Sequence, residues 1–178
     1  MKKLWWSLVI LPVATALQSC GDGPGQRTAH VYGTWVNMEV DKCASAWLLK
    51  RHVDTLAEFV FFPVGQIVSE AIPFDTPDAE LRRTGKLSAF QNILRKYDLE
   101  NPGLKRLGEI IDELEIRSWE VAYQRKSQAA LQMDSLIRDV INISDGPDMC
   151  FRTCFEALDS LYEQILHAEG GSGGDSVN

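Results

Sequence analysis

Short runs of aromatic and β-branched residues predict a small β-sheet in the first half of the chain. The first run covers 31–36 (VYGTWV), and the second, 58–64 (EFVFFPV), is apolar on both faces, as in a buried strand. Between them, 43–53 has the spacing of an amphipathic helix. We expect a further short helix over 65–71 and a short strand over 72–75. The pattern therefore begins as strand, helix, strand.

Beyond residue 76 the apolar positions recur every three or four residues, which predicts helices. Asn101-Pro102 separates the first two of these helices, and Asp145-Gly146-Pro147 separates the last two. The predicted apolar faces lie within 90–97, 104–114, 133–141 and 151–165. The fold class predicted is α+β: a small N-terminal β-sheet with short helices, followed by a mainly helical C-terminal half.

The N-terminus has the pattern of a bacterial lipoprotein signal. Lys2 and Lys3 precede an apolar stretch over 4–17, which is shorter than the ~20 residues that cross a membrane. The stretch ends in Leu-Gln-Ser-Cys, which places Cys20 where a lipobox has its lipidated cysteine. The alternative is an ordinary signal peptide cut nearby. Gly21, rather than Asp, after the cysteine favours the outer membrane over the inner.

These features divide the chain into four parts. We expect a signal peptide over 1–20, a Gly- and Pro-rich tether over 21–30, one folded domain over 31–167, and a disordered Gly/Ser-rich tail over 168–178. The predicted location is the cell envelope, with the domain lipid-anchored and facing the periplasm.

The charge of the chain argues against general nucleic-acid binding. The sequence has 18 Lys and Arg against 25 Asp and Glu, and removal of the first twenty residues leaves 16 against 25, a net charge of −9. Residues 80–96 are locally basic, however, with Arg82, Arg83 and Lys86 near a predicted helix start at Ser88. They form either a solvated helix face or an anion site at a helix N-terminus.

The cysteines and histidines give weak signals for chemistry. Cys150 and Cys154 are four residues apart on the last predicted helix, where they could bind a metal, although Cys154 falls on the apolar face and core packing is the stronger interpretation. A disulfide from Cys43 to one of them is a further alternative in an exported protein. His52 is interpreted as a surface histidine. The sequence contains no Walker loop, HExxH or dinucleotide fingerprint.

A series of short blocks, spread along the whole predicted domain with specific spacing, carries a family resemblance. The blocks are Trp35, 40–42, 47–51, Asp54, 57–59, Pro63, 73–77, Glu80, Gly85, Phe90, Tyr97, Leu99, Leu104, Leu107, 110–111, Asp159, Leu161 and Tyr162. This order resembles the chromate-resistance exported protein family, also known as the C-terminal domain of the ChrB chromate-responsive regulators. The resemblance implies the fold and a link to chromate or general oxyanion stress.

The chain departs from that family pattern at its soft ligands. Ser45-Ala46 stands where the family has Cys-Pro, and Arg83 stands where it has His. Ser88 replaces a family Cys and Gln91 a family Asp, and Glu115 occupies the position of a further family Asp. Thiolate and imidazole are the ligands that zinc prefers, so we expect no metal and no cofactor. The candidate binding residues that remain from the resemblance and the basic run are Asp41, Lys42, Trp47, Arg51, Glu58, Asp75, Glu80 and Arg83.

Three hypotheses follow for function. The first is a non-catalytic lipoprotein whose cleft binds a small oxyanion or a protein partner, with Arg83 facing Asp41, Lys42 and Arg51 and holding the anion through bidentate hydrogen bonds. The second is an enzyme of unknown reaction that uses the carboxylates of Asp41, Glu58 and Asp75. The third is a structural interaction module of the envelope.

Overall fold

The computed structural model describes residues 29–117 and 126–171. The signal peptide, Cys20 and nearly all of the expected tether lie outside these residues, as does most of the C-terminal tail. Within the described part of the chain, no helix is both long and apolar enough to cross a membrane.

Three short parallel strands form the sheet. β1 (Val31–Trp35) is central, with β2 (Glu58–Phe62) on one side and β3 (Ile72–Pro73) on the other. The register pairs Val31 with Glu58 and Trp35 with Phe62, while Tyr32 pairs with Ile72. The predicted helix over 65–71 is wrong: a turn and chain without regular secondary structure occupy this stretch, because Gly65 (φ 87°) and Glu70 (φ 59°) have positive φ values that a right-handed helix excludes.

The connection from β1 to β2 is helical, as parallel strands require. It consists of α1 (Val40–Leu48) and one turn of π-helix, η1 (Leu49–Val53). Every residue of α1 is buried, including its polar residues Asp41, Lys42 and Ser45. The helix packs against all four helices of the C-terminal half, so it is the centre of the molecule rather than an amphipathic surface helix.

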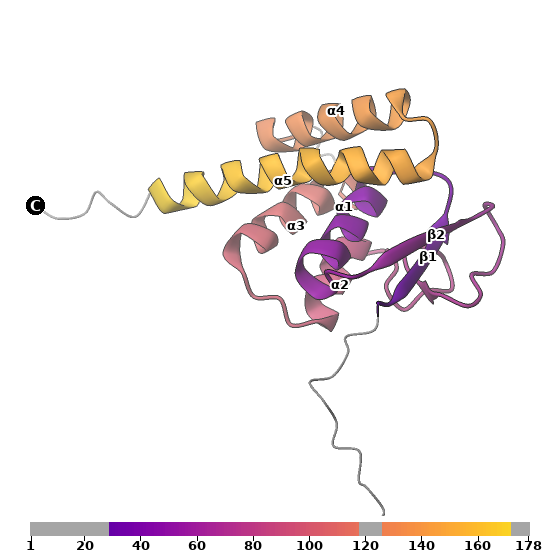
Figure 1. Cartoon of the computed structure of the whole chain (residues 1–178). Coiled ribbons are helices and arrows are strands. Elements are labelled where there is room, and N and C mark those ends of the chain that lie inside the picture. The colour runs from indigo at the N-terminus through magenta and orange to yellow at the C-terminus, as the bar shows by residue number, and fades with distance from the viewer. Residues whose placement is uncertain (1–28, 118–125, 172–178) are drawn as a thin grey trace, which may run out of the picture.

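Four helices build the rest of the domain: α2 (Ala89–Lys96), α3 (Pro102–Glu115), α4 (Gln128–Ile143) and α5 (Pro147–Gly171). Side-chain oxygens of Ser88, Asn101 and Ser127 accept N–H groups at the starts of α2, α3 and α4, the usual role of an N-cap residue. Figure 1 shows α4 and α5 running side by side, with α1 below α5. α5 continues past the expected domain end at His167.

The core joins the sheet to α5 through aromatic rings. Phe59 of β2 contacts Tyr32, Phe74, Phe151 and Phe155, at centroid distances of 5.3 to 6.0 Å. The predicted α+β class, with a small N-terminal sheet and a helical C-terminal half, is confirmed.

Candidate functional site

The N-terminus of α2 is closed by carboxylates of the protein itself. Asp41 accepts the backbone N–H groups of Ala89 (2.7 Å) and Phe90 (3.0 Å), and the hydroxyl of Ser45 lies 3.2 Å away. Asp112 accepts the N–H of Ser88 at 2.9 Å. The free N–H groups of a helix start attract anions. Because these groups are already paired, the hypothesis of an anion site at this helix N-terminus is wrong.

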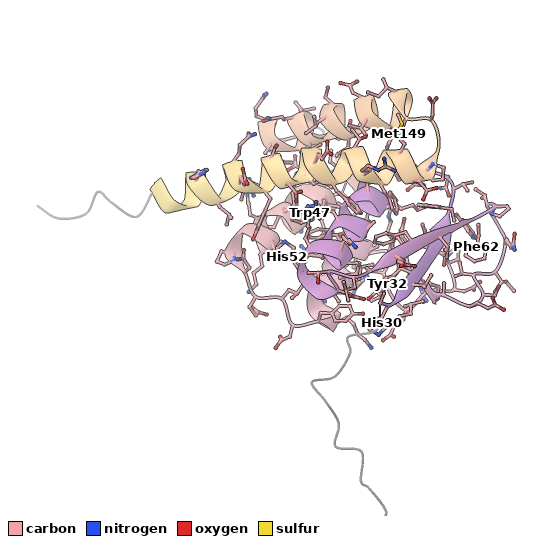
Figure 2. The ribbon with its side chains drawn as sticks, in the orientation of Figure 1. His30, Tyr32, Trp47, His52, Phe62 and Met149 are labelled. Carbon is pink, nitrogen blue, oxygen red and sulfur yellow. The ribbon has the colours of Figure 1, made fainter. Side chains whose placement is uncertain are left out.

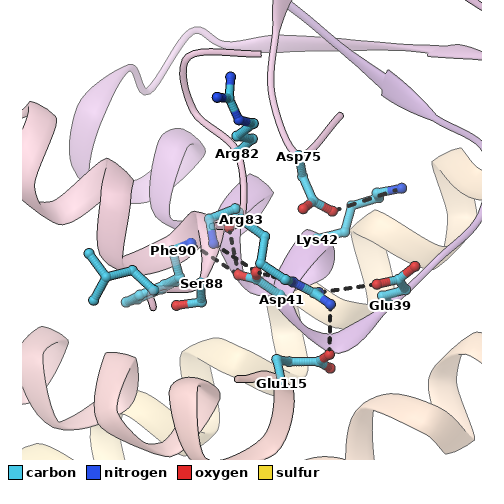
Figure 3. A network of polar contacts seen from close by, with 12 residues as sticks. Glu39, Asp41, Lys42, Asp75, Arg82, Arg83, Ser88, Phe90 and Glu115 are labelled. Atoms are coloured by element: carbon cyan, nitrogen blue, oxygen red, sulfur yellow. Dashed lines mark hydrogen bonds and ion pairs between the residues drawn. The ribbon is translucent and has the colours of Figure 1, made fainter. Parts of the chain in front are cut away.

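Arg83 lies beside Asp41 and is paired with three carboxylates (Figure 3). Its Nε is 3.3 Å from Asp41, its Nη2 is 3.1 Å from Glu39, and its Nη1 is 3.2 Å from Glu115. All three guanidinium nitrogens are therefore engaged within the protein. The expected bidentate contact of Arg83 with a bound anion would require one of these pairs to break.

The charge state of Asp41 reflects two opposing effects. Burial raises its pKa, whereas the N–H groups of Phe90 and Ala89, the guanidinium of Arg83 and the Ser45 hydroxyl lower it. Burial is the largest of these effects, so the pKa of Asp41 lies above its ordinary value, while the two backbone N–H groups at the helix start stabilise the ionised form. Asp41 therefore ties α1, α2 and Arg83 together.

Lys42 is a buried cation on the neighbouring position of α1. Its Nζ donates to the carbonyl oxygens of Trp35 (3.2 Å) and Asn37 (2.6 Å) and to the Asn37 side chain (3.1 Å). Burial lowers the pKa of Lys42, and Asp75, whose carboxylate is 3.9 Å away, raises it. Three acceptors around the ammonium keep it charged.

Asp75 is a further acid with a strongly perturbed environment. It follows β3 with φ of 47°, in the left-handed region that non-glycine residues rarely adopt. Its side chain is 9% exposed. Burial and the negative charge of Asp41 raise the pKa of Asp75 to about 8, and Glu39 acts in the same direction, while Lys42 and Arg83 oppose the shift. Asp75 therefore holds a proton over most of the neutral range.

An open cleft of about 430 Å³ lies beside this network, and Lys42, Asp75 and Arg83 are among the residues that line it. Arg82 lies on its wall, is exposed, and donates from Nη1 to the carbonyl of Ala79 at 2.9 Å. Figure 3 shows the Arg82 guanidinium pointing away from the Asp41 cluster. The lining consists of Trp35, Asn37, Glu39, Lys42, Asp75, Thr76, Pro77, Arg82 and Arg83.

The other predicted site residues lie elsewhere. Trp47 and Arg51 both bind Asp159 of α5: Trp47 Nε1 donates at 2.7 Å, and Arg51 donates from Nε and Nη2 at 3.0 and 2.7 Å. The prediction that Arg51 faces the same cleft as Arg83 is therefore wrong. Glu58 is exposed on β2, and Glu80 pairs with Lys96 on the surface.

His52 is half-buried rather than on the surface as expected. The centroid of its ring lies 5.0 Å from that of Trp47 on α1 (Figure 2) and 5.5 Å from that of Tyr162 on α5. Burial lowers the pKa of His52. Asp54, the nearest acid in sequence, binds His30 instead at 2.9 Å. The geometry gives His52 a packing role.

The structure thus brings together Asp41, Lys42, Asp75 and Arg83 of the predicted set. Sequence reasoning missed Glu39, which had no motif to mark it. It also placed Arg82 and Arg83 in one group, although Arg83 pairs with three carboxylates and Arg82 donates to the carbonyl of Ala79. The consecutive arginines gave no sign of this division.

The fold and this site define a single α+β domain with a buried charge network beside an open, mixed-charge cleft. The family described as ChrB, C-terminal domain, matches residues 32–165, and the chain belongs to this family. It is also 32% identical over 110 residues to Protein ChrB of Cupriavidus metallidurans, a match that covers 61% of this chain and 34% of that protein. The match therefore spans about a third of the curated relative. No solved structure matches the chain.

Proposed function

We propose that this chain is a membrane-anchored envelope lipoprotein related to chromate resistance, and that its cleft binds a small oxyanion without catalysing a reaction. Membership of the ChrB C-terminal domain family supports the relation to chromate resistance. One observation of the cleft supports the ligand: the exposed guanidinium of Arg82, which donates to the Ala79 carbonyl through Nη1, lines the same cleft as Asp75, an acid whose pKa burial raises to about 8.

The cleft and its charge network carry no net negative charge while Asp75 is protonated. Glu39, Asp41 and Glu115 then stand against Arg83, Lys42 and the exposed Arg82, which is three acids against three cations. Carbonyl and amide oxygens surround Lys42. Protonated Asp75 supplies an O–H donor instead of a repelling charge. A tetrahedral oxyanion fits this combination of donors, and Arg82 makes the direct contact.

Calorimetric titration with sulfate at low salt, on the full chain in detergent, tests this assignment. We expect Arg82→Ala to weaken binding about tenfold or more, since hydrogen bonds to charged groups contribute about 1.5–3 kcal/mol. Lys86→Ala is the matched control, because Lys86 is exposed on the same loop and does not line the cleft. Equal heats from the wild type and Arg82→Ala would contradict the proposal.

The same titration has a pH dependence with a defined sign. Asp75 loses its proton as the pH rises through about 8, which places a negative charge beside the anion. Sulfate keeps its charge over this range, so binding should weaken from pH 7 to pH 9 in the wild type. Asp75→Asn should bind with little change across that interval, and asparagine also tolerates the positive φ. Unchanged wild-type affinity from pH 7 to 9 would exclude Asp75 from the site.

The membrane anchor rests on Cys20, which lies outside the described residues. Several acyl chains at ~0.8 kcal/mol per buried CH₂ make a firm anchor. Cys20→Ala should accumulate as an unlipidated precursor that migrates more slowly in gel electrophoresis than the wild type. A variant that migrates and fractionates like the wild type would contradict lipidation.

An enzyme is the second candidate, and the environment of Asp75 favours it. A buried carboxyl with a raised pKa and a positive φ, beside a lysine, has features that active-site acids share. Of the three carboxylates suggested for an enzyme, Asp41 is occupied at the α2 N-terminus and Glu58 lies outside the cleft. Recovery of the titrated anions unchanged supports binding, whereas conversion that Asp75→Asn abolishes would favour the enzyme.

A further inference from the structure

Three cysteines from distant parts of the sequence meet in the core. Cys43 is on α1, and Cys150 and Cys154 are one turn apart on α5. Their side chains are all buried, and the three sulfur atoms lie within 4.8 Å of one another. All three are free thiols. The cysteine pair that the sequence suggested is therefore part of a group of three.

We propose that Cys43, Cys150 and Cys154 form a binding site for a soft, three-coordinate metal ion of the Cu(I) class. This site is separate from the oxyanion cleft. It departs from the expectation of no metal, which rested on the loss of thiol and imidazole ligands at the positions that the family resemblance suggested. The sequence favoured core packing for Cys150 and Cys154 and considered Cys43 only as a disulfide partner of one of them.

The distances between the sulfur atoms fit such an ion. Thiolate–metal bonds of about 2.3 Å in a trigonal plane hold the sulfur atoms about 4.0 Å apart. Cys150 and Cys154 Sγ are 3.9 Å apart, and Cys43 lies within the 4.8 Å limit of both. A disulfide needs an S–S distance of about 2.05 Å. The thiols are thus already spaced for a shared ion, not for a bond between two of them.

The number of ligands selects the class of metal. Structural zinc sites take four protein ligands in a tetrahedron, and soft thiolates also select Cu(I). Among the described residues, the ligand group consists of these three cysteines, with no histidine, aspartate or glutamate in it. A buried site with three sulfur ligands and no fourth suits an ion that is stable with three.

The position of Cys150 gives an ion a route to the site. Cys150 is the fourth residue of α5, its N–H donates to the carbonyl of Gly146, and the preceding residues Asp148 and Met149 are exposed. Helix ends fray, so the first turn can open without unfolding the domain. Binding then exchanges the thiol protons for the ion, with no electron transferred.

Anaerobic Cu(I) titration against a chromophoric competitor tests the proposal. The parent is the full chain carrying Cys20→Ala, which leaves the three core thiols as its cysteines. We expect one Cu(I) per chain and a thiolate-to-copper absorption band in the ultraviolet. Cys43→Ala and Cys154→Ala should each weaken binding about 100-fold or more, since even the loss of a group behind a ligand costs about 10- to 100-fold.

A second measurement does not depend on these variants folding. Cu(I) should protect all three thiols of the parent from alkylation, as mass spectrometry of the peptides would show, and should raise its melting temperature. Arg152→Ala, a change at an exposed position of α5 between Cys150 and Cys154 that removes no thiol, is the matched control and should retain copper. Failure to compete for Cu(I), tighter binding of Zn²⁺ than of Cu(I), or a disulfide among the three would each overturn the proposal.

Discussion

Asp41 illustrates how a residue that resembles a functional acid can hold a fold together. It is completely buried and joins α1 to the start of α2, and its ionised form is satisfied by backbone N–H groups, a hydroxyl and Arg83. Sequence reasoning selected Asp41 correctly as part of a polar cluster. It also predicted that Arg83 faces Asp41, but it could not assign the backbone N–H groups of Ala89 and Phe90, which are more than forty positions away.

Asp41→Asn tests this structural role. Asparagine keeps one acceptor oxygen, but its NH₂ group must face an N–H donor or the guanidinium of Arg83, and one of the three carboxylate partners of Arg83 is lost. Breaking a buried charged network in this way costs about 3 kcal/mol in the free energy of unfolding. Urea denaturation measures the loss.

Glu80→Gln is the control for Asp41→Asn, because Glu80 pairs only with Lys96 at an exposed position, where ion pairs contribute about 0–1 kcal/mol. If Asp41→Asn unfolds at the same urea concentration as the Glu80 variant, the role assigned to Asp41 is wrong.

At the scale of elements, α1 is a helix as predicted but differs from the prediction in its bounds and its burial. The sequence indicated a helix over 43–53 with one apolar face, but α1 begins at Val40, is buried on all sides and ends in the π-helical turn η1. Polar residues at 41, 42 and 45 concealed this burial, since each is paired inside the molecule. The helices of the second half were easier to predict from hydrophobic periodicity, because each of them keeps an exposed polar face.

Asp159 connects this central helix to α5. It accepts the indole N–H of Trp47, which is 1% exposed, and both donors of Arg51. Asp159→Ala leaves the buried indole N–H without an acceptor, so we expect the free energy of unfolding to fall by about 2 kcal/mol.

Asp134→Ala offers a comparison within the same experiment, because its pair with Arg138 lies along the exposed side of α4. We expect that change to cost about 0.5 kcal/mol or less. Equal losses for the two variants in urea unfolding would argue against a specific link between α1 and α5.

At the scale of the whole molecule, the sequence predicted the fold class and the four C-terminal helices, because hydrophobic periodicity depends on neighbours close in sequence. It predicted much less of the site. The cleft and the group of three cysteines depend on contacts between residues such as Cys43 and Cys150, which are joined only by the packing of α1 on α5. The run of basic residues over 80–96 likewise could not show that carboxylates of the protein pair with Arg83 and not with Arg82.

The central claim is that the cleft beside Arg82 and Asp75 is an oxyanion site, and its most direct test locates the anion. Crystals of the full chain soaked in chromate near pH 6.5, with diffraction measured at the chromium absorption edge, would show where chromium lies. We predict one anomalous peak in the cleft, within contact of the Arg82 guanidinium and next to Lys42 and Asp75. An empty cleft, or chromium only at surface lysines, would contradict the claim.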